Sequence, residues 1–235
     1  MKNEKMPFVI AIDGYAGCGK SSTAKAVARE LDFLYIDTGA MYRSIAWYFL
    51  QHGVDYSSDS SALQAALQEV HLSFEREHRG NIPVICLNGE PVEQYIRQPE
   101  VSGAVSQVAV HRSVREAMVE QQRRMGRRES VVMDGRDIGT VVFPHADLKV
   151  FMTAEMETRA RRRLAELEMK GIVSNLEETI ENLRERDRID TSREIAPLKQ
   201  AEDAVVLDTT HLDFQEQVRK VVNWATDRIN SMRSS

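Results

Sequence analysis

An eight-residue stretch near the N-terminus, Gly14-Tyr15-Ala16-Gly17-Cys18-Gly19-Lys20-Ser21, constrains the fold of this chain more than any other feature. It matches the phosphate-binding loop (P-loop) pattern G-x-x-x-x-G-K-[ST] at every defined position. In such a loop, glycines let backbone N–H groups close around an anion, a lysine reaches the β- and γ-phosphates, and a hydroxyl meets Mg²⁺. The sequence therefore predicts a site for a phosphorylated ligand, with Lys20 at the phosphates and Ser21 at the metal ion.

The residues on either side of this loop fit a strand and a helix. Phe8–Ile12 is a continuous apolar run, as expected of a buried parallel strand. Downstream, apolar residues recur at helical spacing, namely Ala24, Val27, Ala28 and Leu31. A bound anion would then lie at a helix N-terminus, where backbone N–H groups attract negative charge.

Composition and charge restrict the class of protein. Of the 235 residues, 42% are hydrophobic and 29% charged, and the formal net charge is −5. No apolar run approaches the roughly 20 residues that span a membrane, and the N-terminal residues lack an export signal, so we expect a cytoplasmic protein. The acidic balance argues against a broad nucleic-acid surface. Cys18 and Cys86 lie far apart without metal-ligand spacing, so we expect both to be reduced.

Five short apolar runs predict one parallel sheet flanked by helices, the arrangement of an α/β protein. They are Phe8–Ile12, Phe33–Ile36, Val131–Met133, Leu148–Met152 and Ala204–Leu207. Residues 37–130 separate the second run from the third, far more than a crossover helix needs. We therefore expect an insertion at that point of the fold.

The insertion contains the pattern of a small antiparallel sheet. Residues 70–74 alternate between apolar and polar, and Ile82–Leu87 runs into Asn88-Gly89, a strong hairpin turn signal, before Glu90-Pro91-Val92. Because proline cannot donate to an interior ladder, Pro83 is expected on an edge strand.

Between the fourth and fifth runs the pattern predicts a helical hairpin. We expect Thr153 to cap the first helix and Gly171 to end it. Ser174 and Glu177 form a capping-box pattern for the second helix, which must end before Pro197. The segment is rich in arginine, at positions Arg159, Arg161, Arg162, Arg163, Arg184, Arg186, Arg188 and Arg193.

These arginines have two interpretations. Each one alone fits a solvated surface, paired with the glutamates of the same helices. Together they favour a lid, because arginines that close over a phosphoryl group stabilise its charge while water is excluded. Arg159, Arg162 and Arg163 share one helical face. Such a lid favours transfer to a bound acceptor over plain hydrolysis.

An acid ends the third apolar run, where open α/β sheets bind ligands. Asp134 is the expected carboxylate near Mg²⁺, with Arg136 and Asp137 directly after it. The alternative is an aspartate that caps the turn after the strand. An arginine in that place suits recognition of phosphate oxygens.

A third group of polar residues belongs to the insertion and its neighbours. Arg43 follows the second run on the ligand side of the sheet, so it is a candidate for an acceptor phosphate. Tyr42 is expected to be a packing residue. Pattern alone does not select Ser106 or Arg115.

Six segments together resemble the bacterial cytidylate kinases. They are the P-loop, residues 37–43 (Asp-Thr-Gly-Ala-Met-Tyr-Arg), 106–109 (Ser-Gln-Val-Ala), 114–117 (Val-Arg-Glu-Ala), 134–144 (Asp-Gly-Arg-Asp-Ile-Gly-Thr-Val-Val-Phe-Pro) and 193–198 (Arg-Glu-Ile-Ala-Pro-Leu). The resemblance implies a P-loop NTPase core of residues 1–40, 114–153 and 193–235. It also implies a nucleoside-monophosphate-binding region at 41–113 and a helical lid at 154–192.

The resemblance further implies the site residues. The CMP phosphate would be held by Arg43, Arg136 and Arg193, the ribose by Arg186 and Asp190, and the cytosine by Ser106, Arg115 and Asp137, with Thr38 and Asp134 completing the CMP set. ATP would be bound by the P-loop with Ser22, Arg159 and Arg162. The residues expected to act in catalysis are Lys20, Arg136, Arg163 and Arg193, and those expected at Mg²⁺ are Ser21 and Asp134.

The P-loop departs from the family pattern in two respects. Tyr15-Ala16 stands where the family commonly has Pro-Ser, which removes one hydroxyl that could contact phosphate. Cys18 stands where a small residue is usual, and its place near a helix N-terminus makes it a candidate reactive thiol.

We therefore expect an ATP- and Mg²⁺-dependent kinase for CMP and dCMP, acting as a monomer without nucleic-acid or membrane partners. UMP is expected to be a poorer substrate. One alternative is another small-molecule P-loop kinase. The other is a P-loop regulatory NTPase, although the sequence has no N-K-x-D guanine signature.

Overall fold

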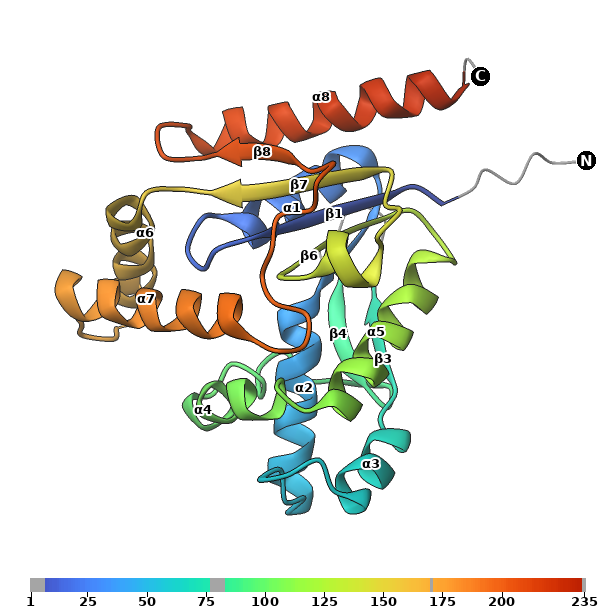
Figure 1. Cartoon of the computed structure of the whole chain (residues 1–235), viewed down its shortest axis with the longest axis vertical. Helices are drawn as coiled ribbons and strands as arrows, with labels where there is room; N and C mark the ends of the chain where they lie inside the picture. Colours follow the sequence, from blue (N-terminus) through green and yellow to red (C-terminus); the bar gives the residue numbers. More distant parts are fainter. Residues whose placement is uncertain (1–6, 77–82, 170, 234–235) are drawn as a thin grey trace, which may run out of the picture.

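The computed structural model describes residues 7–76, 83–169 and 171–233. Its central element is the five-stranded parallel sheet that the sequence predicted, and its strand order is β2-β6-β1-β7-β8. The strands are β1 (Val9–Gly14), β2 (Leu34–Asp37), β6 (Val131–Gly135), β7 (Leu148–Thr153) and β8 (Val205–Asp208). The helices that flank the sheet are α1 (Lys20–Leu31), α2 (Thr38–His52), α5 (Arg112–Gly126) and α8 (Phe214–Arg233). Figure 1 shows the sheet between these helices.

Side chains of the central strand β1 alternate between two apolar cores. Ile10 and Ile12 pack in the core that α1 and α8 cover. Val9 and Ala11 pack in the core that α2 and α5 cover. Because successive side chains of a strand point to opposite faces, a strand covered on both sides requires a continuous apolar run. The continuous apolar run that the sequence shows at Phe8–Ile12 therefore fits a strand that is covered on both faces.

The predicted antiparallel sheet is present in the insertion, with strand order β3-β4-β5. Its elements are α3 (Ser61–Gln68), β3 (Leu72–Glu75), β4 (Val84–Leu87), β5 (Glu90–Pro91) and α4 (Pro99–Val108). Asn88 and Gly89 form the turn with positive φ values of 52° and 87°. The edge-strand position expected for Pro83 is wrong, because β4 is the middle strand and Pro83 lies just before its first residue. Ile82 lies outside the described residues.

The insertion shares its core with the sheet. Leu63, Ile85 and Ile96 belong to the same apolar cluster as Met41 and Met118 of the flanking helices. The expected boundaries after residues 40 and 113 fall inside α2 and α5, so both helices connect the insertion to the sheet. The division into functional regions stays a prediction.

The predicted helical hairpin consists of α6 (Met156–Met169) and α7 (Leu176–Ser192), at the left of Figure 1. Thr153 does not cap α6, because it is the last residue of β7 and pairs with Asp208. Asn175, rather than Ser174, caps α7 by accepting from the backbone N–H of Glu178 at 2.9 Å. Strand β7 thus extends through the expected cap of α6, and α7 begins one residue later than the capping-box pattern predicted.

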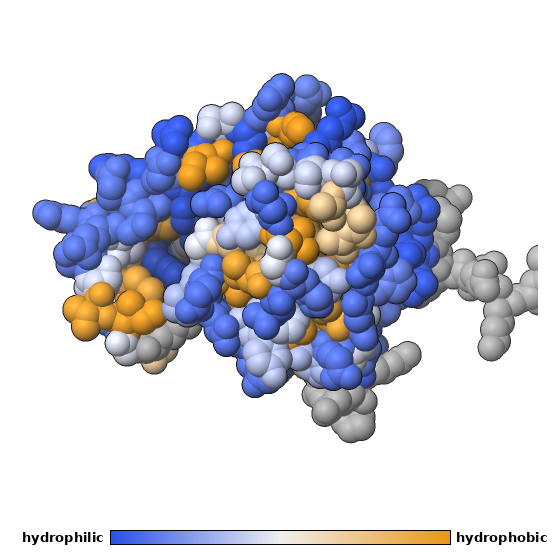
Figure 2. All heavy atoms as spheres, turned by 90° about the horizontal axis from the view of Figure 1, so that it is seen from below, coloured by the Kyte–Doolittle hydropathy of each residue, from blue (hydrophilic) through white to orange (hydrophobic). Residues whose placement is uncertain are grey.

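The turn of the hairpin is exposed and apolar. Gly171 has the positive φ (71°) that ends a helix, and it donates to the carbonyl of Glu168. Met169, Ile172 and Val173 are exposed, and Figure 2 shows apolar side chains at this end of the molecule. Within the described residues, no helix combines the length and apolar character needed to cross a membrane.

Candidate active site

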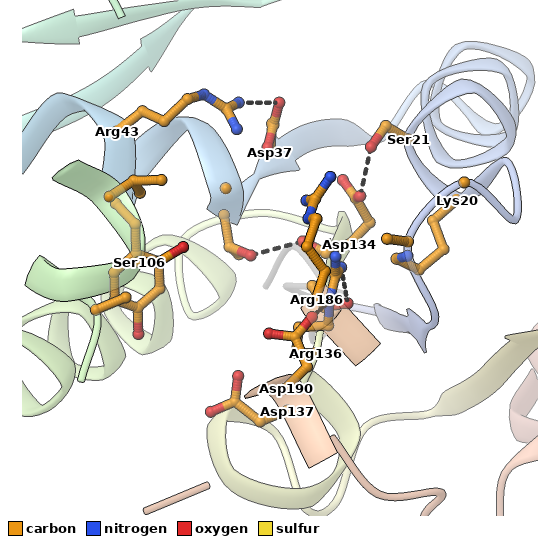
Figure 3. Close-up of a pocket in the computed structure, with 18 of the residues that line it drawn as sticks. Lys20, Ser21, Asp37, Arg43, Ser106, Asp134, Arg136, Asp137, Arg186 and Asp190 are labelled. Atoms are coloured by element: carbon orange, nitrogen blue, oxygen red, sulfur yellow. Dashed lines mark hydrogen bonds and ion pairs between the residues drawn. The ribbon is translucent and has the colours of Figure 1, made fainter. Parts of the chain in front are cut away.

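A cleft of about 360 Å³ opens at the carboxyl ends of β1, β2 and β6. Most of the predicted site residues line it: Ala16, Gly17, Gly19, Lys20, Ser21, Ser22, Thr38, Arg43, Ser106, Arg115, Asp134, Arg136, Asp137, Arg163, Arg186, Asp190 and Arg193. Those outside the lining are Gly14, Tyr15, Cys18, Arg159 and Arg162. Figure 3 shows side chains from the P-loop, α2, β6 and α7 directed toward one space.

The P-loop begins in a position that only glycine tolerates. Gly14 has φ +147°, and a Cβ there would lie 2.0 Å from the backbone oxygen of Met152. Gly17 and Gly19 also have positive φ, at 76° and 93°. The glycines of the motif are therefore required by backbone shape as well as by access to an anion.

Lys20 is buried at the base of the cleft. Its Nζ donates to the carbonyl of Tyr15 at 2.6 Å and lies 3.7 Å from the sulfur of Cys18. Burial, followed by the charge of Arg136, lowers the pKa of Lys20 to about 8. Without a bound anion, the lysine is thus poorly compensated.

The Cys18 thiol faces inward. Its side chain has no exposed surface, and the sulfur donates to the Tyr15 carbonyl at 2.9 Å. Both Cys18 and Cys86 are free and buried. Because reagents attack accessible thiolates, this burial argues against a reactive Cys18 in the observed conformation.

The two residues expected at Mg²⁺ are in contact. Ser21 Oγ donates to Asp134 Oδ2 at 2.8 Å, and the Tyr35 hydroxyl donates to Asp134 Oδ1 at 2.8 Å. Asp134 thus bonds to Ser21 and Tyr35 rather than capping its turn. Burial, followed by the charge of Asp37, raises the pKa of Asp134.

The Ser21 hydroxyl and the Asp134 carboxylate suit Mg²⁺ as two of its ligands. A hydroxyl and a carboxylate are the hard oxygen ligands that Mg²⁺ prefers, completed by water and substrate phosphates. In the described ranges, no group of three or more His, Cys, Asp or Glu residues forms a self-sufficient metal site. The residues therefore fit an ion that arrives with phosphates.

Carboxylates hold the three arginines that were expected at the acceptor phosphate. Asp37 caps α2 through the backbone N–H of Ala40 at 2.8 Å and pairs with Arg43 at 3.1 Å. Asp190 is buried and pairs with both Arg136, at 2.6 Å, and Arg193. The Asp37 and Arg136 pairs are drawn in Figure 3. Asp190, expected at a ribose, here fixes two of the expected phosphate ligands.

Positive charge accumulates between these pairs. Burial, followed by the charge of Arg136, lowers the pKa of the Arg186 guanidinium to about 10, although solvent reaches it through the open cleft. Burial, followed by the charge of Arg115, lowers the pKa of Arg193 to about 10 as well. Because burial and mutual repulsion disfavour the charged form of these arginines, an anion that enters the cleft is bound favourably.

A buried ion pair also lines the cleft. Arg115 of α5 pairs with Asp137, with exposed side-chain fractions of 4% and 8%. Arg115 also donates to the carbonyl of Ala109 at 3.3 Å and lies over the Tyr42 ring. Its Nε is buried and has no partner among the described residues. Ser106, on α4, lines the cleft with an exposed side chain.

The hairpin arginines divide into two groups. Arg163 lines the cleft and pairs with Glu166 at 2.9 Å. Arg159 is buried below the P-loop, where it donates to the Ala16 carbonyl at 3.2 Å and pairs with Asp187 at 2.6 Å. Its first-turn position on α6 places it against the P-loop backbone rather than in the cleft.

Four further hairpin arginines lie away from the cleft, whereas Arg186 and Arg193 line it. Arg162 donates to the carbonyl and the hydroxyl of Thr209 at 2.6 and 2.9 Å. Three others form exposed pairs within their own helices, as the surface interpretation expected: Arg161 with Glu157, Arg184 with Glu181 and Arg188 with Glu185.

Sequence reasoning missed several residues of the site. Tyr35, Asp37 and Asp13 each touch a predicted residue or its loop. Asp37 and Asp13 stand at the carboxyl ends of strands, the same signal that selected Asp134. Arg97, which lines the cleft and pairs with Glu93, carries no signal in its surroundings.

The fold and the cleft together define a class. A P-loop after the central strand, a strand-end carboxylate at its serine and an arginine-bearing helical hairpin are the parts of a P-loop kinase. In fold, the chain is similar to the crystal structure of an uncharacterized protein from Eubacterium ventriosum. The TM-score is 0.52 at 11% identity, over 93% of this chain and 98% of that one.

The sequence then gives the family. A family model for cytidylate kinase matches residues 10–227, and the chain belongs to this family. A cytidylate kinase of Phocaeicola vulgatus is 48% identical over 226 residues, 95% of this chain and 97% of that protein. A cytidylate kinase of Bacillus cereus is 46% identical over 214 residues, 91% of this chain and 94% of that protein. The chain is thus a nucleoside monophosphate kinase.

Proposed function

We propose that the protein transfers the γ-phosphoryl group of ATP to CMP, and to dCMP, with Mg²⁺. The observation that carries this proposal is the buried pair of Arg115 and Asp137 in the same cleft as the P-loop. A site for the phosphoryl donor at the P-loop and a site for a polar base at Arg115 and Asp137 then lie in the same cleft. The names of the relatives also support this proposal, because proteins that this chain covers over 97% and 94% of their length are called cytidylate kinases.

The pair suits cytosine. A carboxylate accepts from the exocyclic amine of cytosine, and an arginine donates to its ring acceptors. Uracil presents a carbonyl where cytosine has the amine, so that carbonyl would face Asp137. Each buried group left unpaired costs about 1 to 3 kcal/mol. UMP is therefore expected to be phosphorylated less efficiently.

Catalysis by these residues would depend on position and charge. Arg43, Arg136 and Arg193 would hold the acceptor phosphate in line with the γ-phosphate. Lys20 and Arg163 would stabilise charge on the transferred group, without a covalent protein intermediate. Mg²⁺, held by Ser21 and Asp134 together with the phosphates, would neutralise charge on the phosphate oxygens.

A substrate panel tests this function directly. Purified protein with ATP and Mg²⁺ is offered CMP, dCMP, UMP and AMP, and diphosphate formation is measured. The highest kcat/KM is expected for CMP or dCMP. A preference for another acceptor would establish a different small-molecule kinase, and hydrolysis without an acceptor product would favour a regulatory NTPase. Gel filtration tests the proposed monomer.

The affinity for ATP should fall as the pH rises above about 8. Below its pKa of about 8, Lys20 is charged and attracts the phosphates; above it, the free protein carries a neutral amine. Binding must then take up a proton, which weakens affinity by up to about tenfold per pH unit. Calorimetric titration at pH 7, 8 and 9 in two buffers of different ionisation enthalpy measures both effects. An unchanged Kd between pH 7 and 9 contradicts the prediction.

Asp190→Asn should lower kcat by on the order of tenfold, because misplaced phosphate ligands reduce in-line geometry. The neutral amide would no longer hold Arg136 and Arg193 together. The matched control is Glu185→Gln on the same helix, which breaks the exposed pair with Arg188. Steady-state kinetics should show wild-type values for the control. Equal kcat for both variants would mean that Asp190 does not position the arginines.

A further inference from the structure

A buried carboxylate on the central strand has no assigned role. Asp13 precedes the first glycine of the P-loop and is 5% exposed. Its two oxygens accept from consecutive backbone N–H groups: Oδ1 from Ile138 at 2.8 Å and Oδ2 from Gly139 at 2.7 Å. Each oxygen of the carboxylate therefore accepts a hydrogen bond from the same loop.

That loop carries two residues of the acceptor site. Ile138 and Gly139 open a π-helical segment (η1, Ile138–Val142) that directly follows Arg136 and Asp137. In the sheet, Asp13 is aligned with Gly135 of β6. Asp13 thus bonds to the loop on one side of Arg136 and Asp137, while β6 fixes the loop on the other.

The loop backbone lies directly against the Asp13 carboxylate. A Cβ added to Gly139 would lie 3.4 Å from Asp13 Oδ2 and 3.2 Å from Cδ of Lys149. The carboxylate is costly to bury: loss of water raises the pKa of Asp13 to about 6, against the lowering effect of the two N–H groups. The charges that face it are Asp137, which raises this pKa, and Lys20, which lowers it. An apolar residue of similar size would avoid this desolvation cost. The contribution of Asp13 is therefore its two hydrogen bonds to the loop.

We propose that Asp13 is a positioning residue, which sets where Asp137 and Arg136 stand in the acceptor part of the cleft. It acts through the backbone of residues 138 and 139 and does not touch a substrate. The inference rests on the proposed function for the identity of the acceptor. Because Asp13 belongs to the P-loop strand, it also fixes the acceptor loop relative to the donor loop.

Asp13→Asn tests this inference. The amide offers one accepting oxygen and turns its NH₂ toward the second backbone N–H, so one bond is lost and the loop must move. We expect KM for CMP to rise about tenfold, while KM for ATP changes less than twofold. The measurement is steady-state kinetics with each substrate varied in turn, together with the Tm of each variant.

A matched control separates positioning from general stability. Asp147 accepts from the backbone N–H of Val9 at 2.7 Å, at the opposite end of the same strand. Asp147→Ala removes this acceptor, and should lower Tm but leave both KM values unchanged. If Asp13→Asn raises both KM values equally, or neither, the inference is wrong.

A second variant approaches the same contact from the loop. Gly139→Val extends beyond a Cβ position that is already in contact with Asp13 Oδ2 at 3.4 Å and Lys149 Cδ at 3.2 Å, so its methyl groups push the loop away from the carboxylate and should also raise KM for CMP selectively. Should Asp13→Asn fail to fold, Gly139→Val decides: a selective rise in KM for CMP supports the inference, and an unchanged KM overturns it. Failure of the proposed function looks different, because the wild-type protein would then form no CDP.

Discussion

Lys20→Ala should reduce kcat for CDP formation by about a thousandfold, the scale observed when one preorganised donor to a developing charge is removed. Lys20 is the buried cation of the P-loop, with its Nζ on the Tyr15 carbonyl. A phosphoryl group in transfer spreads charge over its oxygens, and a buried cation stabilises that charge more than water does. Deleting the side chain removes this stabilisation and leaves a cavity that water can enter.

The control for this prediction lies on the same helix. Arg29 is an exposed cation in the last turn of α1, so Arg29→Ala removes one positive charge without reaching the cleft. Coupled assays at saturating ATP and CMP should give wild-type turnover for Arg29→Ala. If folded Lys20→Ala retains more than about a tenth of wild-type kcat, the lysine is not a catalytic residue.

The parts of the fold that the sequence predicted are those governed by local pattern. The apolar run before Gly14 predicted a buried strand correctly, because a strand that is covered on both faces needs apolar side chains at every position. Asn88-Gly89 indicated a hairpin because its turn needs positive φ. The caps expected at Thr153 and Ser174 were wrong, because β7 extends through Thr153 and because the adjacent Asn175 also has a side chain that can cap α7.

The site was predicted where one motif carries both position and chemistry. Ser21 and Asp134 meet because P-loop and strand ends converge at the same edge of a parallel sheet. Spacing on a helix did not reveal that Arg159 lies under the P-loop, because that depends on how α6 packs. Pairs such as Arg136 with Asp190 join distant segments, so no local pattern contains them.

These distant pairs have a common effect on the cleft. Arg193 lies near Arg136, and Arg43 lies near Arg97. Arg43, Arg136 and Arg193 each have a carboxylate partner, either Asp37 or Asp190. Opposite charges at such distances offset the repulsion between neighbouring guanidinium groups. The arginines are therefore held in place before an anion binds, which reduces the ordering cost of binding.

Asp137→Asn should lower kcat/KM for CMP by on the order of a hundredfold and narrow the preference for CMP over UMP. The pair with Arg115 is almost fully buried, so a neutral partner leaves the arginine charge uncompensated. Asparagine offers both an acceptor and a donor, so its amide can pair with the cytosine amine or with a uracil carbonyl. The loss should therefore be larger for CMP than for UMP.

The matched control for Asp137→Asn breaks an exposed pair on the same helix as Arg115. Glu116→Gln removes the partner of Arg112, whose side chain is 75% exposed, and exposed pairs contribute about 0 to 1 kcal/mol. Competition assays with CMP and UMP, run beside thermal unfolding, should show an altered ratio for Asp137→Asn alone. Since a base-reading carboxylate acts on one substrate more than the other, a folded Asp137→Asn variant with the wild-type CMP/UMP ratio would show that Asp137 supports the cleft without reading the base.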